Sequence, residues 1–342
     1  MNLTGHLLYI DITQICGLGC NFCMYADKHK GGSQMHLSQR SVENLAGLVN
    51  DSAVKRTCVS GEGEPLNNIE TFHGILRTSR GGRSFEFITS GFLPHEQMRQ
   101  FYATSDAILQ GNRDRCTIRL SSDSYHVEKL RHRPHGFSLG YALQQNNSAL
   151  SFSFRSVDTD RSFTRSYLLK EAAAAGGQGR IEERGPLQDA LLLGGRSFAI
   201  DYKNHVHPGA TVPQGYLDLH AYIGAIEQRS GKRFTLGSIN PAPMGNGMDV
   251  TIKPDGSVLF YGIENIPVGN IHSDRLTWAM LATQVADTPA IRRLYTWPFA
   301  DVIAPLAQDE TMARLVKQTN NPYWLLKQLA LHPGLLERIG AA

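Results

Sequence analysis

The stretch ITQICGLGCNFCMYAD, residues 12–27, contains three of the five cysteines in this chain of 342 residues. Cys16, Cys20 and Cys23 follow a C-x3-C-x2-C pattern, with two glycines between the first and the second cysteine. Because glycine adopts backbone conformations that other residues resist, such a loop can turn its three thiols to one side. We therefore predict that the loop binds a metal centre through thiolates, in a compartment where cysteines stay reduced.

The number of thiols limits what this loop can hold. Structural zinc sites usually have four protein ligands, and a fully protein-ligated [4Fe–4S] cluster also takes four cysteines. Three cysteines favour a cluster in which one iron keeps an open position for another ligand. Cys58 and Cys116 fall within predicted strands, where free cysteine usually packs as a small hydrophobic residue. On spacing alone, a zinc site completed by His29, His36 or Cys58 is the alternative.

Composition narrows the class of protein. Hydrophobic residues make up 41% and charged residues 19% of the chain, which is typical of a globular protein. No apolar run approaches the roughly 18–20 residues of a membrane span, and the N-terminus lacks the features of a signal peptide. The net charge is +3, without a run of five basic residues, so we expect no nucleic-acid partner. We expect a cytoplasmic protein that has no membrane partner.

Short β-rich runs alternate with helix-like runs through the first two hundred residues. The predicted strands cover residues 6–13, 56–60, 84–90, 116–122, 151–157 and 197–203. This alternation predicts parallel strands joined by crossover helices, and six such units predict a partial (β/α)6 barrel that resembles an open TIM barrel. The active site of such a barrel lies at the carboxyl ends of its strands. Glycines within KEAAAAGGQGRIEERG, residues 170–185, predict a frayed and mobile helix end.

The pattern changes at about residue 204. MDVTIKPDGSVLF, residues 248–260, predicts a β-hairpin that turns at Asp255-Gly256, and the tail from about residue 277 has a helical pattern. We therefore divide the chain into a barrel over residues 1–203 and a C-terminal lobe with a helical tail over residues 204–342.

The cysteine loop, placed directly after the first strand, resembles the signature of the radical S-adenosylmethionine (radical SAM) superfamily. An aromatic residue precedes the third cysteine in that signature, and Phe22 has this position here. The resemblance implies one [4Fe–4S] cluster on Cys16, Cys20 and Cys23, whose fourth iron chelates S-adenosylmethionine (SAM). An electron from a reductant such as flavodoxin or ferredoxin would then cleave SAM, and the resulting 5′-deoxyadenosyl radical would abstract a hydrogen atom from the substrate.

Segments after the later strands resemble the SAM-binding motifs of the same superfamily. SGEGEPL, residues 60–66, is similar to the Gly-Gly-Glu-Pro motif that holds the methionine amino group. TSG, residues 89–91, is similar to a Thr-Asn-Gly motif, and the fourth strand ends in a Ser-x-Asp pattern. An arginine on the fifth strand matches one that pairs with the methionine carboxylate. The SAM-binding residues implied by this resemblance are Phe22, Gly61, Glu62, Gly63, Glu64, Thr89, Ser121, Asp123 and Arg155.

Residues 240–281 resemble the front of a SPASM or twitch domain, which carries auxiliary clusters in many radical SAM enzymes. A cysteine usually follows the second hairpin strand of that module, but no cysteine occurs after Cys116 in this chain. We therefore expect a lobe without an auxiliary cluster, which shapes a substrate pocket instead. The candidate catalytic residues are Tyr125, His126, Tyr261 and Glu264. Each has a structural alternative, either capping a helix or packing the hairpin against the barrel.

The resemblance implies an enzyme of natural-product biosynthesis that acts on a small molecule or a short peptide. Rearrangement, bond formation and epimerisation all begin with the same hydrogen abstraction. A radical SAM methyltransferase is one alternative, with S-adenosylhomocysteine as its coproduct. A non-catalytic iron–sulfur or zinc module that binds a partner is the other.

Overall fold

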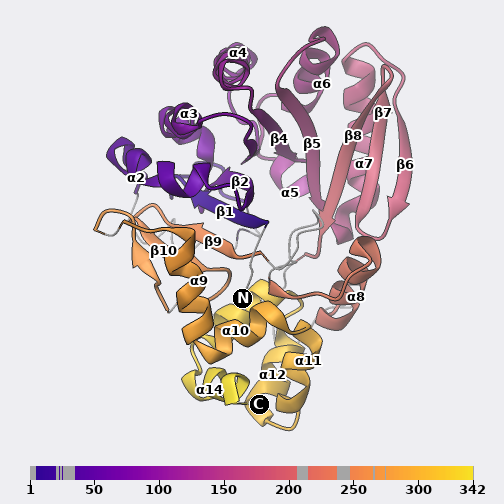
Figure 1. Cartoon of the computed structure of the whole chain (residues 1–342). Coiled ribbons are helices and arrows are strands. Elements are labelled where there is room, and N and C mark those ends of the chain that lie inside the picture. The colour runs from indigo at the N-terminus through magenta and orange to yellow at the C-terminus, as the bar shows by residue number, and fades with distance from the viewer. Residues whose placement is uncertain are drawn as a thin grey trace.

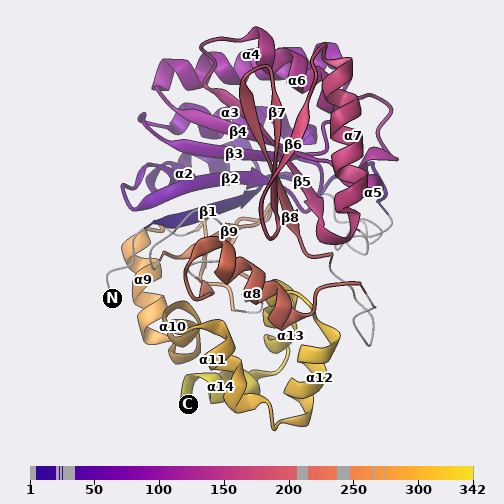
Figure 2. The ribbon, with the colours of Figure 1, turned by 90° about the vertical axis from the view of Figure 1, so that its right-hand side faces the viewer.

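The structure is a computed structural model that describes residues 5–20, 23, 25, 35–205, 215–236, 247–264, 266–273 and 275–341. The described residues form an eleven-stranded sheet with the order β11-β10-β9-β1-β2-β3-β4-β5-β8-β7-β6 (Figure 1). The sheet curves around a central space, and helices cover its outer face (Figures 1 and 2).

Six neighbouring strands of this sheet are parallel and form the partial barrel. They are β1 (His6–Asp11), β2 (Val54–Ser60), β3 (Ser84–Thr89), β4 (Arg115–Ser121), β5 (Leu150–Val157) and β8 (Arg196–Lys203). The predicted partial (β/α)6 barrel is confirmed, since each predicted strand matches one of these within two residues at each end. The carboxyl ends of the six strands therefore meet at one mouth.

Crossover helices pack on the outside of the barrel strands. They are α2 (Gln39–Asn50), α3 (Ile69–Thr78), α4 (His95–Asn112), α6 (Pro134–Gln144) and α7 (Arg161–Ala174), with the short elements η1 (Pro65–Asn68), α5 (Ser124–Val127) and η2 (Asp158–Asp160) at the mouth. In α2, the apolar positions Val42, Leu45 and Val49 recur at helical spacing and are buried. The hydroxyl of Ser38 accepts a hydrogen bond from the backbone N–H of Ser41 and caps the start of this helix.

An antiparallel hairpin, β6 (Arg180–Gly185) and β7 (Gln188–Leu193), extends the sheet beyond β8. The prediction of a frayed segment over residues 170–185 is therefore wrong for its second half. Four of the six residues of β6 are charged and none is buried, so their own sequence gives little strand signal, and pairing with the mostly buried strand β7 holds them.

The C-terminal part adds the predicted hairpin and a helical tail. Strands β9 (Asp249–Ile252) and β10 (Ser257–Phe260) are antiparallel, and Gly256 takes a φ of 83° at their turn. The other elements are α8 (Leu219–Ser230), β11 (Gly269–Asn270), α9 (Trp278–Asp287), α10 (Pro289–Thr296), α11 (Phe299–Ile303), η4 (Ala304–Leu306), α12 (Glu310–Gln318), α13 (Pro322–Leu329) and α14 (Pro333–Ala341).

The hairpin joins the barrel sheet directly, because β9 pairs in parallel with β1. Figure 2 shows α10 to α14 together below the barrel, whereas α9 contacts the barrel helix α2, because the indole N–H of Trp278 donates to the carbonyl of Leu48 at 2.9 Å. A boundary at residue 203 remains a prediction. Within the described ranges, no helix combines the length and the apolar character needed to cross a membrane.

Candidate active site

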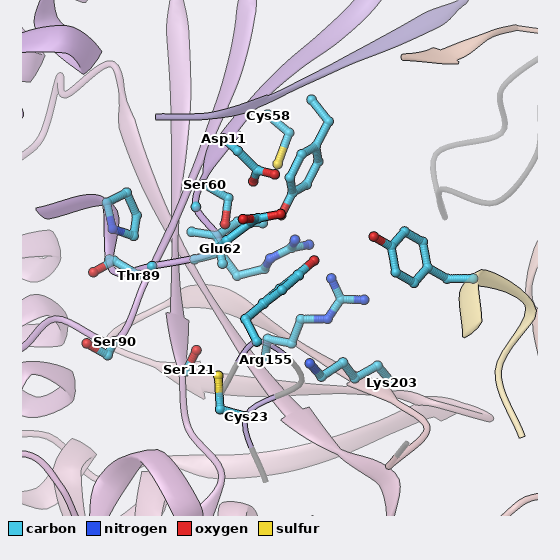
Figure 3. Close-up of a pocket in the computed structure, with 18 of the residues that line it drawn as sticks. Asp11, Cys23, Cys58, Ser60, Glu62, Thr89, Ser90, Ser121, Arg155 and Lys203 are labelled. Carbon is cyan, nitrogen blue, oxygen red and sulfur yellow. The ribbon is translucent and has the colours of Figure 1, made fainter. Parts of the chain in front are cut away.

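A pocket of about 700 Å³ lies inside the barrel mouth (Figure 3). Side chains from β1, β2, β3, β4, β5, β8 and β9 line it, and residues of α8 and α13 complete its wall. Alternation along the strands decides which side chains face inward. On β9 and just after it, Asp249, Thr251 and Lys253 line the pocket, whereas Val250 and Ile252 are buried in the hydrophobic core.

The predicted cluster ligands Cys16, Cys20 and Cys23 all line this pocket, are partly buried and form no disulfide. The backbone N–H of Cys23 donates to the carbonyl of Cys20, which closes the turn between them. Burial raises the pKa of Cys20 to about 12, and the nearby Cys16 and Cys23 thiols add to the effect. A bound metal centre is therefore needed to hold these groups as thiolates. The predicted contact Phe22 lies outside the described residues.

The arrangement of the donors fits an iron–sulfur cluster better than a single metal ion. In the part of the chain that the structure describes, no three His, Cys, Asp or Glu side chains converge on one ion. A [4Fe–4S] cluster does not require such convergence, because each thiolate binds a different iron. Three thiols that face one pocket satisfy this requirement.

The glycine-rich loop after β2 is hydrogen-bonded to the segment that leads into the cysteine loop. The N–H of Gly63 donates to the carbonyl of Thr13, and the N–H of Glu64 donates to the carbonyl of Ile15, both over 2.9 Å. A Cβ atom at Gly63 would lie 2.3 Å from the Ile15 carbonyl oxygen, and one at Gly61 would lie 2.8 Å from that of Thr13. The close approach of the two backbones therefore requires glycine at both positions.

Glu64 connects this loop to the end of β3. Its side chain is 4% exposed, and its carboxylate accepts hydrogen bonds from the hydroxyl of Thr89 at 2.5 Å and from the N–H and hydroxyl of Ser90 at 2.9 and 2.6 Å. The N–H of Leu66 donates to the same carboxylate. Two of the predicted SAM-binding residues, Glu64 and Thr89, are thus bonded to each other and fix the shape of the mouth.

Glu62 points into the pocket beside Asp11 (Figure 3). It is 3% exposed; its Oε1 lies 2.9 Å from the ammonium of Lys253, and its Oε2 accepts a hydrogen bond from Gln14. The Lys253 ammonium also lies 3.0 Å from Asp11 Oδ2. Burial alone would lower the pKa of Lys253, but the surrounding groups, with Asp11 first and Glu62 among them, raise it above its ordinary value. The C-terminal hairpin is therefore joined to the barrel by a buried ion-pair cluster.

Ser121 and Asp123 lie at the end of β4 on another side of the pocket. Asp123 is buried, and its carboxylate accepts hydrogen bonds from the backbone N–H of His126 at 3.0 Å and from the ring Nδ1 of His126 at 2.8 Å. Burial would raise the pKa of Asp123, but the hydrogen bonds and charge of His126 lower it. Asp123 is therefore the cap of α5, and His126 is held against it.

Arg155 and Lys203 project into the pocket from the ends of β5 and β8 (Figure 3). Burial, together with the charge of Arg119, lowers the pKa of Arg155. Burial and the neighbouring Arg155 lower the pKa of Lys203 to about 8. Within the described ranges, the buried Nε of Arg155 has no hydrogen-bond partner. This side of the pocket is therefore built to receive an anionic group.

The four predicted catalytic candidates divide into two pairs. His126 and Tyr261 line the pocket, and the Tyr261 ring packs edge-on against Tyr323 with the centroids 4.9 Å apart. Tyr125 and Glu264 are not among the lining residues. The ring of Tyr125 contacts His205, and Glu264 accepts a hydrogen bond from Tyr323 and pairs with Lys327.

Several pocket residues were not predicted from the sequence, namely Asp11, Lys203, Asp249 and Lys253. Cys58, expected in the core, is buried but also lines the pocket (Figure 3). Asp11 and Lys203 could have been predicted from their positions in the sequence, because each is the last residue of a strand whose carboxyl end forms the mouth. Asp249 and Lys253 could not be predicted in this way, because the sequence around them does not show that β9 pairs with β1.

The parallel barrel has three cysteines at its mouth, and the segment before them is hydrogen-bonded to a glycine-rich loop, as the resemblance to a radical SAM domain predicts. The family described as the radical SAM superfamily matches residues 10–137, which include the cysteine loop and the first four strands. The predicted resemblance to the radical SAM superfamily is confirmed over these residues, and the match supports an enzyme. Membership of this superfamily implies a [4Fe–4S] cluster and SAM. None of the curated protein sequences matches the chain.

Solved structures share the fold over nearly the whole chain. A structure titled "Native anSMEcpe with bound AdoMet and Cp18Cys peptide" is 15% identical, with a TM-score of 0.52 over 98% of this chain and 99% of that one. A second, "His6 tagged anSMEcpe with bound AdoMet", is also 15% identical, with a TM-score of 0.53 over 99% of this chain and 98% of that one. At this identity the similarity is one of fold, and it includes the C-terminal part.

Proposed function

We propose that this enzyme binds one [4Fe–4S] cluster through Cys16, Cys20 and Cys23 and uses SAM to abstract a hydrogen atom from a small natural product or a short peptide. The observation that carries the proposal is one pocket that combines three free thiols, a glycine-rich loop and an Arg155 Nε that has no hydrogen-bond partner among the described residues. When bound, the cluster supplies the electron that cleaves SAM to methionine and a 5′-deoxyadenosyl radical.

The charges of the pocket support one orientation of the methionine part of SAM. Its carboxylate would bind Arg155 and Lys203, which are the cations on the β5 and β8 side. Its amino group would lie at the glycine-rich loop, where Glu62 and backbone carbonyl groups accept hydrogen bonds. Glu64 would not contact the ligand directly, because its carboxylate already accepts four hydrogen bonds from its own chain.

The C-terminal lobe, assigned to residues 204–342, would enclose the substrate. Tyr222, Tyr261 and Tyr323 contribute to the pocket wall from this part of the chain. A single cluster is proposed because no cysteine follows Cys116. A peptide substrate is supported by the fold shared with anSMEcpe, whose structure was solved with the Cp18Cys peptide bound.

The proposal is tested by anaerobic reconstitution with iron and sulfide, followed by reduction and addition of SAM. We expect about four irons per chain and formation of 5′-deoxyadenosine, and we expect both to be lost in Cys20→Ala. Flavodoxin or ferredoxin should replace a chemical reductant. S-adenosylhomocysteine as the main product would indicate methyl transfer instead, and bound zinc or uncleaved SAM would overturn the proposal.

A further inference from the structure

Asp249 places a carboxyl group at the start of β9, on the inner side of the barrel. It lies opposite Leu7 in the parallel pair with β1, lines the pocket and is only 4% exposed. Within the described part of the chain, its buried Oδ1 has no hydrogen-bond partner. Burial of a carboxyl group without a partner is unfavourable, so this position needs an explanation.

The backbone of Asp249 is held on both sides, which fixes the direction of its side chain. Its N–H donates to the hydroxyl oxygen of Tyr295 at 3.2 Å, and its carbonyl accepts from the same hydroxyl at 2.8 Å and from the N–H of Tyr261 at 3.1 Å. With the backbone bonded in this way, strand alternation directs the carboxyl inward, on the same face as Thr251 and Lys253.

This carboxyl is separate from the groups proposed to hold SAM. Asp249 precedes Lys253 by four residues, which is roughly 13 Å along a strand at 3.3 Å per residue. The ammonium of Lys253 contacts Asp11 and Glu62, which lie at the mouth of the barrel. Asp249 therefore lies deeper in the barrel, where a substrate group could reach it beyond the SAM site.

The surroundings of Asp249 leave room for a cationic ligand. Burial raises the pKa of Asp249 to about 7, and the charge of Arg56 lowers it only in part, because Arg56 also pairs with Glu86 at 3.4 Å. A cation bound at the carboxyl group would offset this cost of burial. Tyr261 is close enough that, after burial, the charge of Asp249 is the next cause that raises its pKa. Tyrosine rings attract cations through their faces, and Tyr222 and Tyr261 both line the pocket.

We propose that Asp249 binds a primary amine of the substrate at the base of the pocket and so selects substrates that carry one. An ammonium group would donate to the carboxylate oxygen that has no hydrogen-bond partner among the described residues, and it would add a second positive charge to that of Arg56. This inference rests on the proposed function, because it assumes that the pocket beneath the SAM site holds the substrate.

The test uses the reconstituted enzyme with SAM bound and three probes of similar size: 2-phenylethylamine, 2-phenylethanol and 3-phenylpropanoate. Their dissociation constants are measured by ligand-observed NMR. In the wild type we expect the amine to bind at least about tenfold more tightly than the alcohol, as a charge-assisted hydrogen bond implies. Asp249→Asn should remove this preference and leave binding of the alcohol unchanged. Asp287→Asn, which alters an exposed carboxyl group at the end of α9, is the matched control.

Equal affinity for the amine and the alcohol in the wild type, or no binding of the amine, would overturn the assignment without any variant. An Asp249→Asn protein that keeps the preference would do the same. Loss of SAM binding in this variant would identify Asp249 as part of the SAM site instead. Formation of 5′-deoxyadenosine by the wild type without added substrate is measured in parallel. If no 5′-deoxyadenosine forms, the proposed function is refuted, whereas the preference for the amine is still decided by the dissociation constants.

Discussion

Replacement of Asp249 by asparagine should change how the stability of the enzyme depends on pH. Burial raises the pKa of Asp249 from 3.8 to about 7. The folded protein therefore retains a proton that the unfolded chain releases above about pH 4, so the free energy of unfolding falls as pH rises toward 7 and is level above it. A difference of about 3 in pKa, at 1.36 kcal/mol for each pH unit between the two values, corresponds to a total change of about 4 kcal/mol in the unfolding free energy.

The experiment is urea unfolding under anaerobic conditions from about pH 5.5 to about pH 8, where about 2 kcal/mol of this change should occur. Asp249→Asn cannot titrate at this position, so its unfolding free energy should lack that fall, and the difference between variant and wild type should grow in favour of the variant as pH rises. Asp287→Asn should follow the wild type. Parallel pH profiles for Asp249→Asn and the wild type would refute the reasoning, because Asp249 would then titrate as an exposed carboxyl group does.

Three further predictions concern the mouth of the pocket. Gly63→Ala should lower the iron content after reconstitution well below that of the wild type, because its Cβ would lie 2.3 Å from a carbonyl oxygen of the cysteine segment. Gly17→Ala should retain the iron, because no atom of the described residues, apart from its chain neighbours, would lie within 4 Å of its Cβ. Lys253→Met should lower the unfolding free energy in urea by about 3–5 kcal/mol, since it leaves two buried carboxylates without their ammonium partner. Adding Glu62→Gln to this variant should restore part of the lost free energy. A change below about 1 kcal/mol in Lys253→Met would contradict the ion-pair assignment. Arg155→Met should weaken SAM binding at least about tenfold in equilibrium dialysis with the iron content unchanged, as expected for loss of a charged hydrogen bond, and an unchanged affinity would exclude Arg155 from the SAM site.

The barrel could be predicted from the sequence because its strands carry local signals. The six parallel strands are short runs rich in apolar and β-branched residues, and helices with an apolar face, such as α2 and α3, follow the first of them. The β6–β7 hairpin was missed because most residues of β6 are charged and none is buried, and only pairing with β7 makes them a strand. Tertiary pairing decided the structure of that segment, and its own composition did not.

The candidate site was predictable where it follows a motif and hidden where it depends on contacts between distant segments. The three cysteines, the glycine-rich loop and Arg155 line one pocket, as their positions after successive strands predict. Lys253 was hidden because it lies next to a hairpin turn, where a lysine is ordinarily exposed. It is buried only because β9 pairs with β1, which brings residues about 240 positions apart within hydrogen-bond distance.

A C-terminal lobe without cysteines must hold its hairpin by means other than a metal cluster. Lys253 bonds the hairpin to the barrel, and Glu264, which lies 3.8 Å from the Lys253 ammonium, bonds to α13 through Tyr323 at 2.7 Å and Lys327 at 3.2 Å. These contacts join the hairpin to both the barrel and α13 and leave the inward side chains of Asp249 and Tyr261 facing the pocket. The carboxylates and the tyrosine that Lys253 and Glu264 contact hold the lobe in place, whereas the carboxyl of Asp249 has an oxygen without a hydrogen-bond partner among the described residues. Substitutions at Lys253 or Glu264 should therefore lower the stability at every pH, whereas substitution of Asp249 should alter substrate selection and the pH dependence of stability.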